Sequence, residues 1–125
     1  MKTPHFFCQI SLSLLCLSQV FYLHAASQKI SQSAQGLFSS EQAAYGKTLY
    51  EKNCASCHGL NLQGGNASAL IGDDFLIRWS SDGKTLGDLV YVIRTTMPLG
   101  SAGVMDKQSY LDITTYLLEK NGQIT

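Results

Sequence analysis

Apolar residues recur at helical spacing in three parts of the chain. In the first part, which we expect to be a helix at about 40–53, they are Ala43, Gly46, Leu49 and Tyr50. In the second, at about 86–95, they are Leu86, Leu89, Val90 and Ile93. In the third, Tyr110, Ile113, Thr114 and Leu117 fall on one face. No stretch shows the convincing alternation of a strand, so the sequence predicts an all-α fold of three to four short helices and long loops.

The predicted helices carry recognisable end signals. Ser39 and Gln42 have the spacing of a capping box before the first helix. The second helix should end before Met97-Pro98, since the residue that precedes proline avoids helical geometry. Asp106 is the expected N-cap of the third helix, and Asn121-Gly122 is its expected end.

The longest predicted loop, at about 59–76, is rich in glycine and asparagine. Glycines allow the backbone to turn at positive φ or to approach a neighbouring group closely. A short apolar segment from Phe75 to Trp79 ends this region, and we expect it to be buried. Short helices around such long loops make a small core, which a large bound prosthetic group would complete.

The N-terminal part of the chain has a different pattern. A weakly basic start with Lys2 and His5 precedes an uncharged apolar run, 6–23, and the small pair Ala25-Ala26 follows it. This order is typical of a secretory signal peptide. An uncleaved membrane anchor is the alternative, because the run approaches the spanning length of about 18–20 residues. Interspersed Ser and Gln residues lower its hydrophobicity and favour cleavage. A lipoprotein site at Cys16 is disfavoured by the bulky Leu15 before it.

These patterns divide the chain into a signal peptide, 1–26, a flexible Ser/Gln-rich leader, 27–38, and one domain, 39–125. The full chain has nine basic and nine acidic residues. Cleavage removes one of the basic residues and leaves eight against nine, a net charge of −1. The chain has no basic excess, so nothing in its charge suggests that it binds nucleic acid.

Cleavage also concentrates the reactive side chains. Of four cysteines and three histidines, only Cys54, Cys57 and His58 would remain. They form Cys54-Ala55-Ser56-Cys57-His58, which is C-x-x-C-H, the attachment sequence of c-type haem. Each thiol can add to one vinyl group of the porphyrin, and the adjacent imidazole can bind the iron. The sequence therefore predicts one covalent haem c.

Three other uses of two cysteines fit the sequence less well. A thioredoxin-type redox pair requires strands next to the helix, and the sequence predicts no strand. A structural zinc site needs four ligands, often in two pairs, and no second cluster follows. A simple disulfide explains neither the histidine nor the glycine-rich loop.

The second axial ligand of the iron must come from elsewhere in the chain. No second histidine would remain after cleavage, so the candidates with a soft ligand atom are Met97 and Met105. Methionine is more often a core residue than a ligand. We predict Met97 as the ligand because it follows a helix and precedes a rigid proline. Met105 is interpreted as a packing residue or a contact at the haem edge.

With these residues identified, the sequence resembles the class I cytochromes c over 39–122. Gly46 and Tyr50 are similar to the family's glycine–aromatic pair, where the first and last helices cross closely. The resemblance implies Tyr116 or Leu117 as the opposing residue, and Met97-Pro98 is similar to the family's axial methionine motif. The pattern across 64–98 is most similar to cytochromes associated with quinoprotein dehydrogenases of bacteria.

The resemblance also suggests groups that support the haem. Relatives often have proline where Ser68 aligns, and the backbone carbonyl of that region accepts the ring N–H of the ligand histidine. Serine keeps the carbonyl but makes the loop less stiff. Arg78 and Trp79 would bind a haem propionate, although a solvated cation and a packed aromatic are the ordinary roles of such residues.

These features predict a periplasmic protein that carries single electrons from a dehydrogenase or a membrane redox complex to an oxidase or reductase. It would be a monomer, not an enzyme, and not inserted in the membrane after cleavage. An open-site haem enzyme or gas sensor is one alternative, although the sequence shows no obvious acid–base group beside the haem. A dedicated subunit of one quinoprotein dehydrogenase is another.

Overall fold

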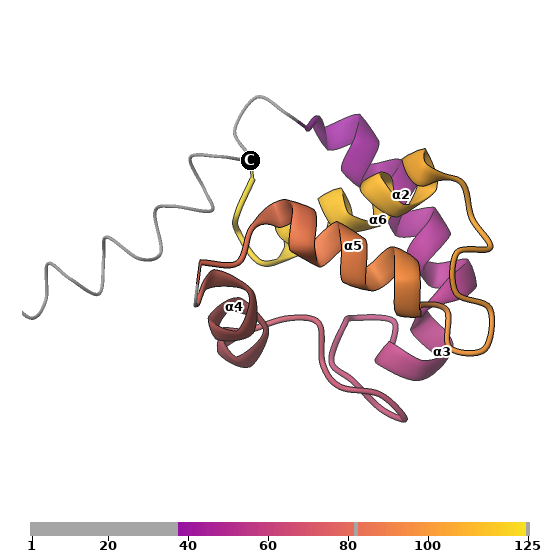
Figure 1. The fold of residues 1–125 in the computed structure, drawn as a ribbon, viewed down its shortest axis with the longest axis horizontal. Coiled ribbons are helices and arrows are strands. Elements are labelled where there is room, and N and C mark those ends of the chain that lie inside the picture. The colour runs from indigo at the N-terminus through magenta and orange to yellow at the C-terminus, as the bar shows by residue number, and fades with distance from the viewer. Residues whose placement is uncertain (1–37, 82, 125) are drawn as a thin grey trace, which may run out of the picture.

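The computed structural model describes residues 38–81 and 83–124, which form five helices and no strand. The helices are α2 (Ser40–Asn53), α3 (Ala55–His58), α4 (Asp73–Ser80), α5 (Leu86–Thr96) and α6 (Lys107–Lys120) (Figure 1). The predicted all-α class is therefore confirmed. The predicted signal peptide, 1–26, and all of the leader except Phe38 lie outside the described residues. Within those residues, no helix has the length and hydropathy required to cross a bilayer.

Helix α2 has the predicted bounds, but only half of the expected capping box forms at its N-terminus. The Ser39 hydroxyl accepts the backbone N–H of Gln42 at 3.2 Å. The Gln42 side chain does not complete a capping box, because its amide donates instead to the Asp112 carboxylate of α6 at 2.9 Å. A hydrogen bond to an ionised acceptor is stronger than one between neutral groups, and this explains why the long-range partner prevails.

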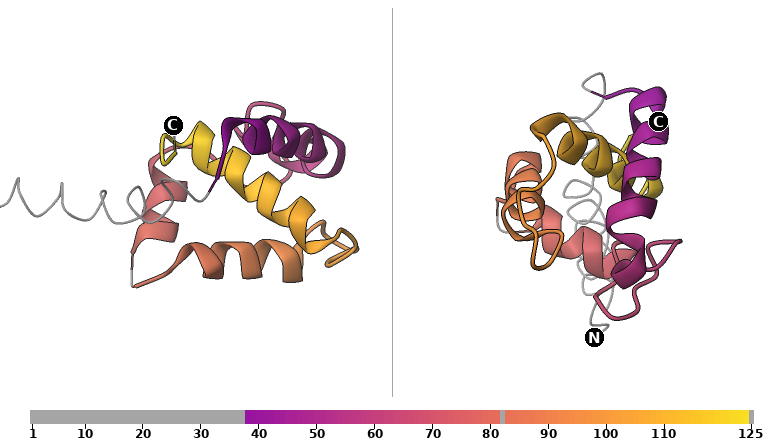
Figure 2. Two further views of the ribbon diagram at one scale, coloured as in Figure 1. Left: turned by 90° about the horizontal axis from the view of Figure 1, so that it is seen from above. Right: turned by 90° about the vertical axis from the view of Figure 1, so that its right-hand side faces the viewer.

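Helices α2 and α6 cross at Gly46, and their contact forms the main part of the core (Figure 2). A Cβ atom built on Gly46 would overlap the backbone carbonyl of Asp112, so only glycine allows the helices to come this close. One turn further on, the rings of Tyr50 and Tyr116 pack with centroids 5.5 Å apart. Tyr116 therefore opposes Tyr50, whereas Gly46 faces the backbone at 112–113.

Helix α6 is buried more completely than its predicted stripe suggests. All seven residues from 112 to 118 are buried, including polar Asp112, Thr114 and Thr115. The reason is that α6 contacts two helices, α2 and α5, so most of its circumference faces protein. The threonine hydroxyls satisfy their hydrogen bonds within the helix by donating to the carbonyls of Tyr110 and Leu111.

Helices α4 and α5 complete the fold around the loops. A full capping box between Thr85 and Asp88 begins α5, which ends just before Met97 as predicted. The apolar segment from Phe75 to Trp79 lies within α4, and the expectation that all of it is buried is wrong. Phe75 is buried, but the Ile77 side chain is 63% exposed. Residues two positions apart on a helix face different directions, so one face of α4 points to solvent.

Candidate haem-binding site

The two cysteines and the histidine of the C-x-x-C-H sequence share one short turn after α2. Helix α2 ends at Asn53, and the four-residue helix α3 carries Cys57 and His58. The backbone N–H groups of these two residues both donate to the carbonyl of Cys54, at 3.1 and 3.0 Å. The turn therefore brings both thiols and the imidazole together by local hydrogen bonds alone.

The two thiols differ in their surroundings, although both are free. Cys57 is exposed, whereas Cys54 is partly buried against the core. Burial, together with the nearby Cys57, raises the pKa of the Cys54 thiol to about 11. Cys54 therefore remains a neutral thiol at physiological pH, which disfavours direct metal binding because a metal requires the thiolate.

The His58 ring is held in one orientation by the loop that follows it. Its Nδ1 atom lies 2.7 Å from the backbone carbonyl oxygen of Ser68, and the residue is buried. A carbonyl can only accept, so Nδ1 must carry the proton and donate. Nε2 then keeps a free lone pair, as a metal-binding imidazole requires. The predicted carbonyl acceptor at Ser68 is thus confirmed in the structure.

The loop around this histidine is fixed by further hydrogen bonds to the backbone of the turn. Ala67 N–H donates to the Cys57 carbonyl at 3.0 Å, and Gly64 N–H donates to the His58 carbonyl at 2.8 Å. The Tyr50 hydroxyl of α2 donates to the Gly59 carbonyl at 2.6 Å. Burial raises the pKa of the Tyr50 hydroxyl, with smaller contributions from Cys54 and Tyr116, so it stays a donor.

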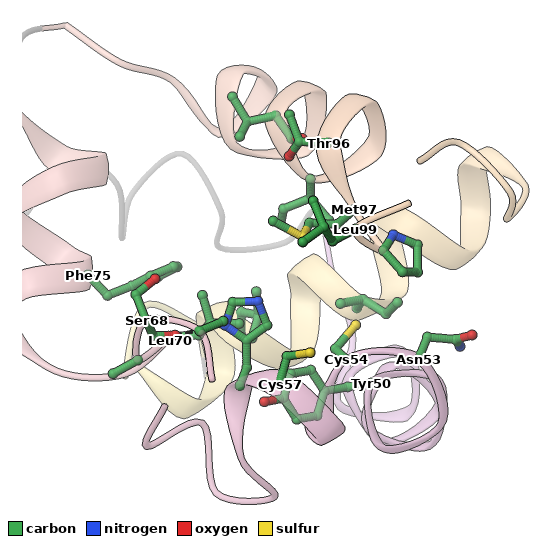
Figure 3. A pocket seen from close by; sticks show the side chains of 18 of the residues that line it. Tyr50, Asn53, Cys54, Cys57, Ser68, Leu70, Phe75, Thr96, Met97 and Leu99 are labelled. Carbon is green, nitrogen blue, oxygen red and sulfur yellow. Dashed lines mark hydrogen bonds between the residues drawn. The ribbon is translucent and has the colours of Figure 1, made fainter. Parts of the chain in front are cut away.

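A cavity of about 550 Å³ opens beside this turn. Cys54 and Cys57 line one side of it, and Met97 and Leu99 lie across it from the cysteines (Figure 3). His58 also lines the cavity. Apolar side chains of the other helices close the walls, among them Phe75, Leu89, Ile93, Ile113 and Leu117. The volume is in the range of ordinary cofactor sites, about 300–1,000 Å³. Two thiols, an oriented imidazole and apolar walls on one cavity fit a covalently attached haem.

The structure separates the two candidate methionine ligands. Met97 is the residue directly after α5, and its side chain lines the cavity (Figure 3). Its backbone N–H donates to the Ile93 carbonyl at 2.9 Å, and its carbonyl accepts from the Tyr110 hydroxyl at 2.9 Å. Met105 lies instead against the hydrophobic core and not among the residues that line the cavity.

The two residues expected near a propionate, Arg78 and Trp79, both line the cavity from α4. Arg78 is exposed, and its backbone carbonyl accepts from the Lys84 ammonium at 2.8 Å. The same ammonium lies 5.8 Å from the centroid of the Trp79 ring. Asp74 also lines the cavity, and no pattern in the sequence indicated this acidic neighbour. Positive and negative side chains therefore occur together at the α4 edge.

Three residues that support the site were not recognised from the sequence. Tyr50 and Tyr110 were interpreted as core residues, and their hydroxyls hold the backbone of Gly59 and Met97. Asn121 was interpreted as a helix end. Its side chain also donates to the Leu70 carbonyl at 2.9 Å and accepts from the N–H of Gly72 at 3.0 Å, which joins α6 to the loop that carries Ser68. Because the partners are backbone groups, no pair of residue types could have revealed these contacts.

The comparison with protein families gives a match over most of the chain. The family model described as cytochrome C oxidase, cbb3-type, subunit III matches residues 41–117, which include the whole turn, the cavity loop, α4 and Met97. No curated protein and no solved structure matches the chain.

Proposed function

The chain belongs to the family described as cytochrome C oxidase, cbb3-type, subunit III, a family of c-type cytochrome domains, and from this premise we propose how it carries electrons. Membership implies haem-based electron transfer and a covalent haem c, for which Cys54 and Cys57 are in position. Our proposal is that this is a monohaem carrier of the class I type, with His58 and Met97 as the two axial ligands of the iron.

One observation carries the proposal. His58, with its Nδ1 proton held by the Ser68 carbonyl, and Met97 line the same apolar cavity from different parts of the chain. When bound, haem supplies a one-electron change at its iron. The residues of the chain then determine how that change proceeds: a methionine sulfur raises the reduction potential, and apolar walls disfavour the extra positive charge of the oxidised state.

With both axial positions taken by side chains, the protein would not be an enzyme. Substrates and gases would have to displace Met97 before they could bind. The residues around the cavity also offer no histidine other than His58 that could act as an acid or base. The role left to such a site is the exchange of electrons with other redox proteins.

We further propose that the protein works in the periplasm as a monomer, after removal of the signal peptide predicted at 1–26. The donor would be a dehydrogenase, for which a quinoprotein dehydrogenase is our candidate, or a membrane redox complex; the acceptor would be an oxidase or reductase. The small net charge favours docking through apolar contact. In support, Leu99 and Val92 both line the cavity, and their side chains are 88% and 38% exposed.

Optical spectra of the full chain, matured with haem-attachment machinery, test the ligand set. We expect sharp reduced bands of a covalent c-type haem and a weak far-red band of ferric iron bound to sulfur, which disappears in Met97→Ala. A far-red band that persists in Met97→Ala would contradict the assignment. Rapid binding of carbon monoxide to the reduced wild-type protein would favour the open-site enzyme or sensor instead.

Two further measurements test location and partnership. N-terminal sequencing of the protein from the periplasmic fraction should show a start near residue 27, whereas a chain beginning at Met1 in the membrane fraction would contradict cleavage. If the protein is purified from the native host at a fixed ratio with one dehydrogenase, it is a dedicated subunit of that enzyme and not a free carrier.

A further inference from the structure

We propose that Tyr110 is a positioning residue for Met97: its hydroxyl holds the backbone of that residue so that the thioether stays directed into the cavity. The inference rests on the proposed role of Met97 as an iron ligand. The pair joins two elements, because Met97 follows α5 and Tyr110 lies in the first turns of α6. Its hydroxyl donates to the Met97 carbonyl at 2.9 Å.

Tyr110 is itself firmly held. Its side chain is completely buried, so its ring cannot move without opening the core. The helix start that carries it is capped by Asp106, whose carboxylate accepts the backbone N–H of Ser109 at 2.9 Å and the Ser109 hydroxyl at 2.8 Å. A buried donor on a capped helix is a rigid reference point for the partner that it contacts.

The segment that Tyr110 contacts has few such supports. After Met97 the chain runs through a loop, 98–105, whose backbone hydrogen bonds are local: Ser101 N–H to the Pro98 carbonyl at 2.8 Å, and Val104 N–H to the Ser101 carbonyl at 3.3 Å. In the described residues, the Tyr110 hydroxyl makes the side-chain hydrogen bond that ties this segment to α6. Removing it leaves the Met97 backbone with the hydrogen bond of its N–H to the Ile93 carbonyl of α5.

A purely structural role for Tyr110 predicts a different outcome. If the residue only fills the core, loss of its oxygen lowers the stability of the whole protein and leaves the strength of the sulfur–iron bond unchanged. If it positions Met97, an external ligand that competes with the thioether should bind more tightly. Competition by imidazole for the ferric iron separates these cases, because imidazole can bind only where Met97 has left.

The experiment uses the full, haem-loaded chain as wild type, Tyr110→Phe and Thr115→Val. Phenylalanine keeps the ring and so the packing. Thr115→Val is the matched control: its hydroxyl is equally buried on α6 and donates to a backbone carbonyl at 2.8 Å, but within the helix and away from Met97. Imidazole affinity and the far-red sulfur band of the ferric protein are measured together with unfolding by urea.

We expect imidazole to bind Tyr110→Phe roughly three- to tenfold more tightly than wild type, which is the change that one lost hydrogen bond produces. The far-red band should weaken at the same time, and Thr115→Val should keep the wild-type affinity. An unchanged affinity in Tyr110→Phe, or an equal rise in both variants, would overturn the role of Tyr110 while Met97 remains the ligand. A wild-type protein without the sulfur band would overturn the ligand assignment and this inference together.

Discussion

The two sides of the cavity are built in different ways. The attachment side, residues 54–70, is held mainly by hydrogen bonds between residues that are close in the sequence: those around His58 span at most ten residues, and one bond from Asn121 to Leu70 adds a link to α6. The methionine side, residues 97–105, depends on contacts from helices that are formed elsewhere. Its side-chain hydrogen bond to α6 comes from the Tyr110 hydroxyl, and Leu99 in this segment is almost fully exposed.

This difference indicates which of the two proposed axial ligands should dissociate from the iron first. Local contacts form and reform without rearrangement of the core, so the His58 ring has a stable position as long as its own loop is intact. The methionine side keeps its position only while α5 and α6 stay packed. Regions with few buried contacts open at a smaller free-energy cost than the global unfolding of the protein. If His58 and Met97 are the axial ligands, as we propose, Met97 should therefore leave the iron while His58 still binds it.

The largest effect should come from the cysteines. In the double variant Cys54→Ala, Cys57→Ala, no thiol of the attachment turn can bond to the porphyrin, and we expect complete loss of covalent haem. Haem staining after denaturing electrophoresis and the mass of the chain measure this. Met97→Ala is the matched control from the other side, and it should keep one covalent haem per chain. Loss of covalent haem in Met97→Ala would remove the distinction between the two sides.

The second largest effect should come from the crossing of α2 and α6, which sets the attachment side and the methionine side relative to each other. Gly46→Ala places a Cβ on the Asp112 carbonyl, so α2 and α6 must separate. Overpacking of this kind typically costs about 1–3 kcal/mol of unfolding free energy. Because α6 carries Tyr110, the far-red band should weaken while the haem stays attached.

Gly87→Ala is the control for Gly46→Ala, since it adds the same methyl to another helix, α5. The nearest atom to a Cβ there is the Thr85 hydroxyl oxygen at 3.4 Å, an ordinary contact. Alanine in a helix is more favourable than glycine by roughly 0.5–1 kcal/mol, so this variant should be as stable as wild type or more so. Urea unfolding compares the two, and equal losses in both would contradict the close-crossing explanation.

The sequence was sufficient for the parts of the fold that depend on local pattern. The starts of α2, α5 and α6 were predicted to within a residue, since each long amphipathic stretch also carries a capping residue. Helices α3 and α4 were not predicted as helices, because four and eight residues are too few to show a period of 3.6. The exposure of Ile77 was missed for the same reason, because so short a segment does not show which face of a helix is apolar.

For the site, the sequence was sufficient where the chemistry requires particular residue types. Cysteine and histidine at fixed spacing can be recognised, and the Ser68 carbonyl was found only through the family resemblance. The contacts of Tyr110 and Asn121 could not be found, because any residue offers the carbonyl or N–H that they bind. Which backbone group lies within reach depends on the packing of α6, and that is a property of the whole fold.

A smaller effect should come from Asn121, which supports the attachment side from α6. Asn121→Ala removes both of its bonds to the loop, to Leu70 and Gly72. We expect a loss of about 1–2 kcal/mol, since each such hydrogen bond contributes about 1 kcal/mol. Urea unfolding of the ferric protein measures it, and imidazole affinity should stay at the wild-type value because Met97 is untouched. Asn121→Asp keeps an acceptor for Gly72 and should lose less. A rise in imidazole affinity as large as that of Tyr110→Phe would show that the two sides are not independent.

The smallest effect is a dependence on pH at the helix start that holds Tyr110. The Ser109 N–H and hydroxyl hold the pKa of the Asp106 carboxyl below its ordinary value of about 3.9. A carboxyl whose pKa is lower in the folded state stabilises that state above its unfolded pKa, and this contribution is lost as the pH falls through the folded pKa. Wild type should therefore be slightly more stable than Asp106→Asn at pH 6, and the difference should vanish in acid.

Glu41→Gln makes the same comparison on α2, where the backbone and Ser39 lower the pKa of Glu41. Urea unfolding from pH 6 to pH 2 measures both differences. If this cap supports the methionine side, Asp106→Asn binds imidazole more tightly than wild type at pH 6, the ratio of the two affinities falls toward one in acid, and Glu41→Gln keeps the wild-type affinity. The affinities are compared at the same pH, because protonation of free imidazole in acid weakens its binding to all variants alike. An affinity that responds equally to both substitutions would mean that α2 and α6 transmit acid effects to Met97 alike.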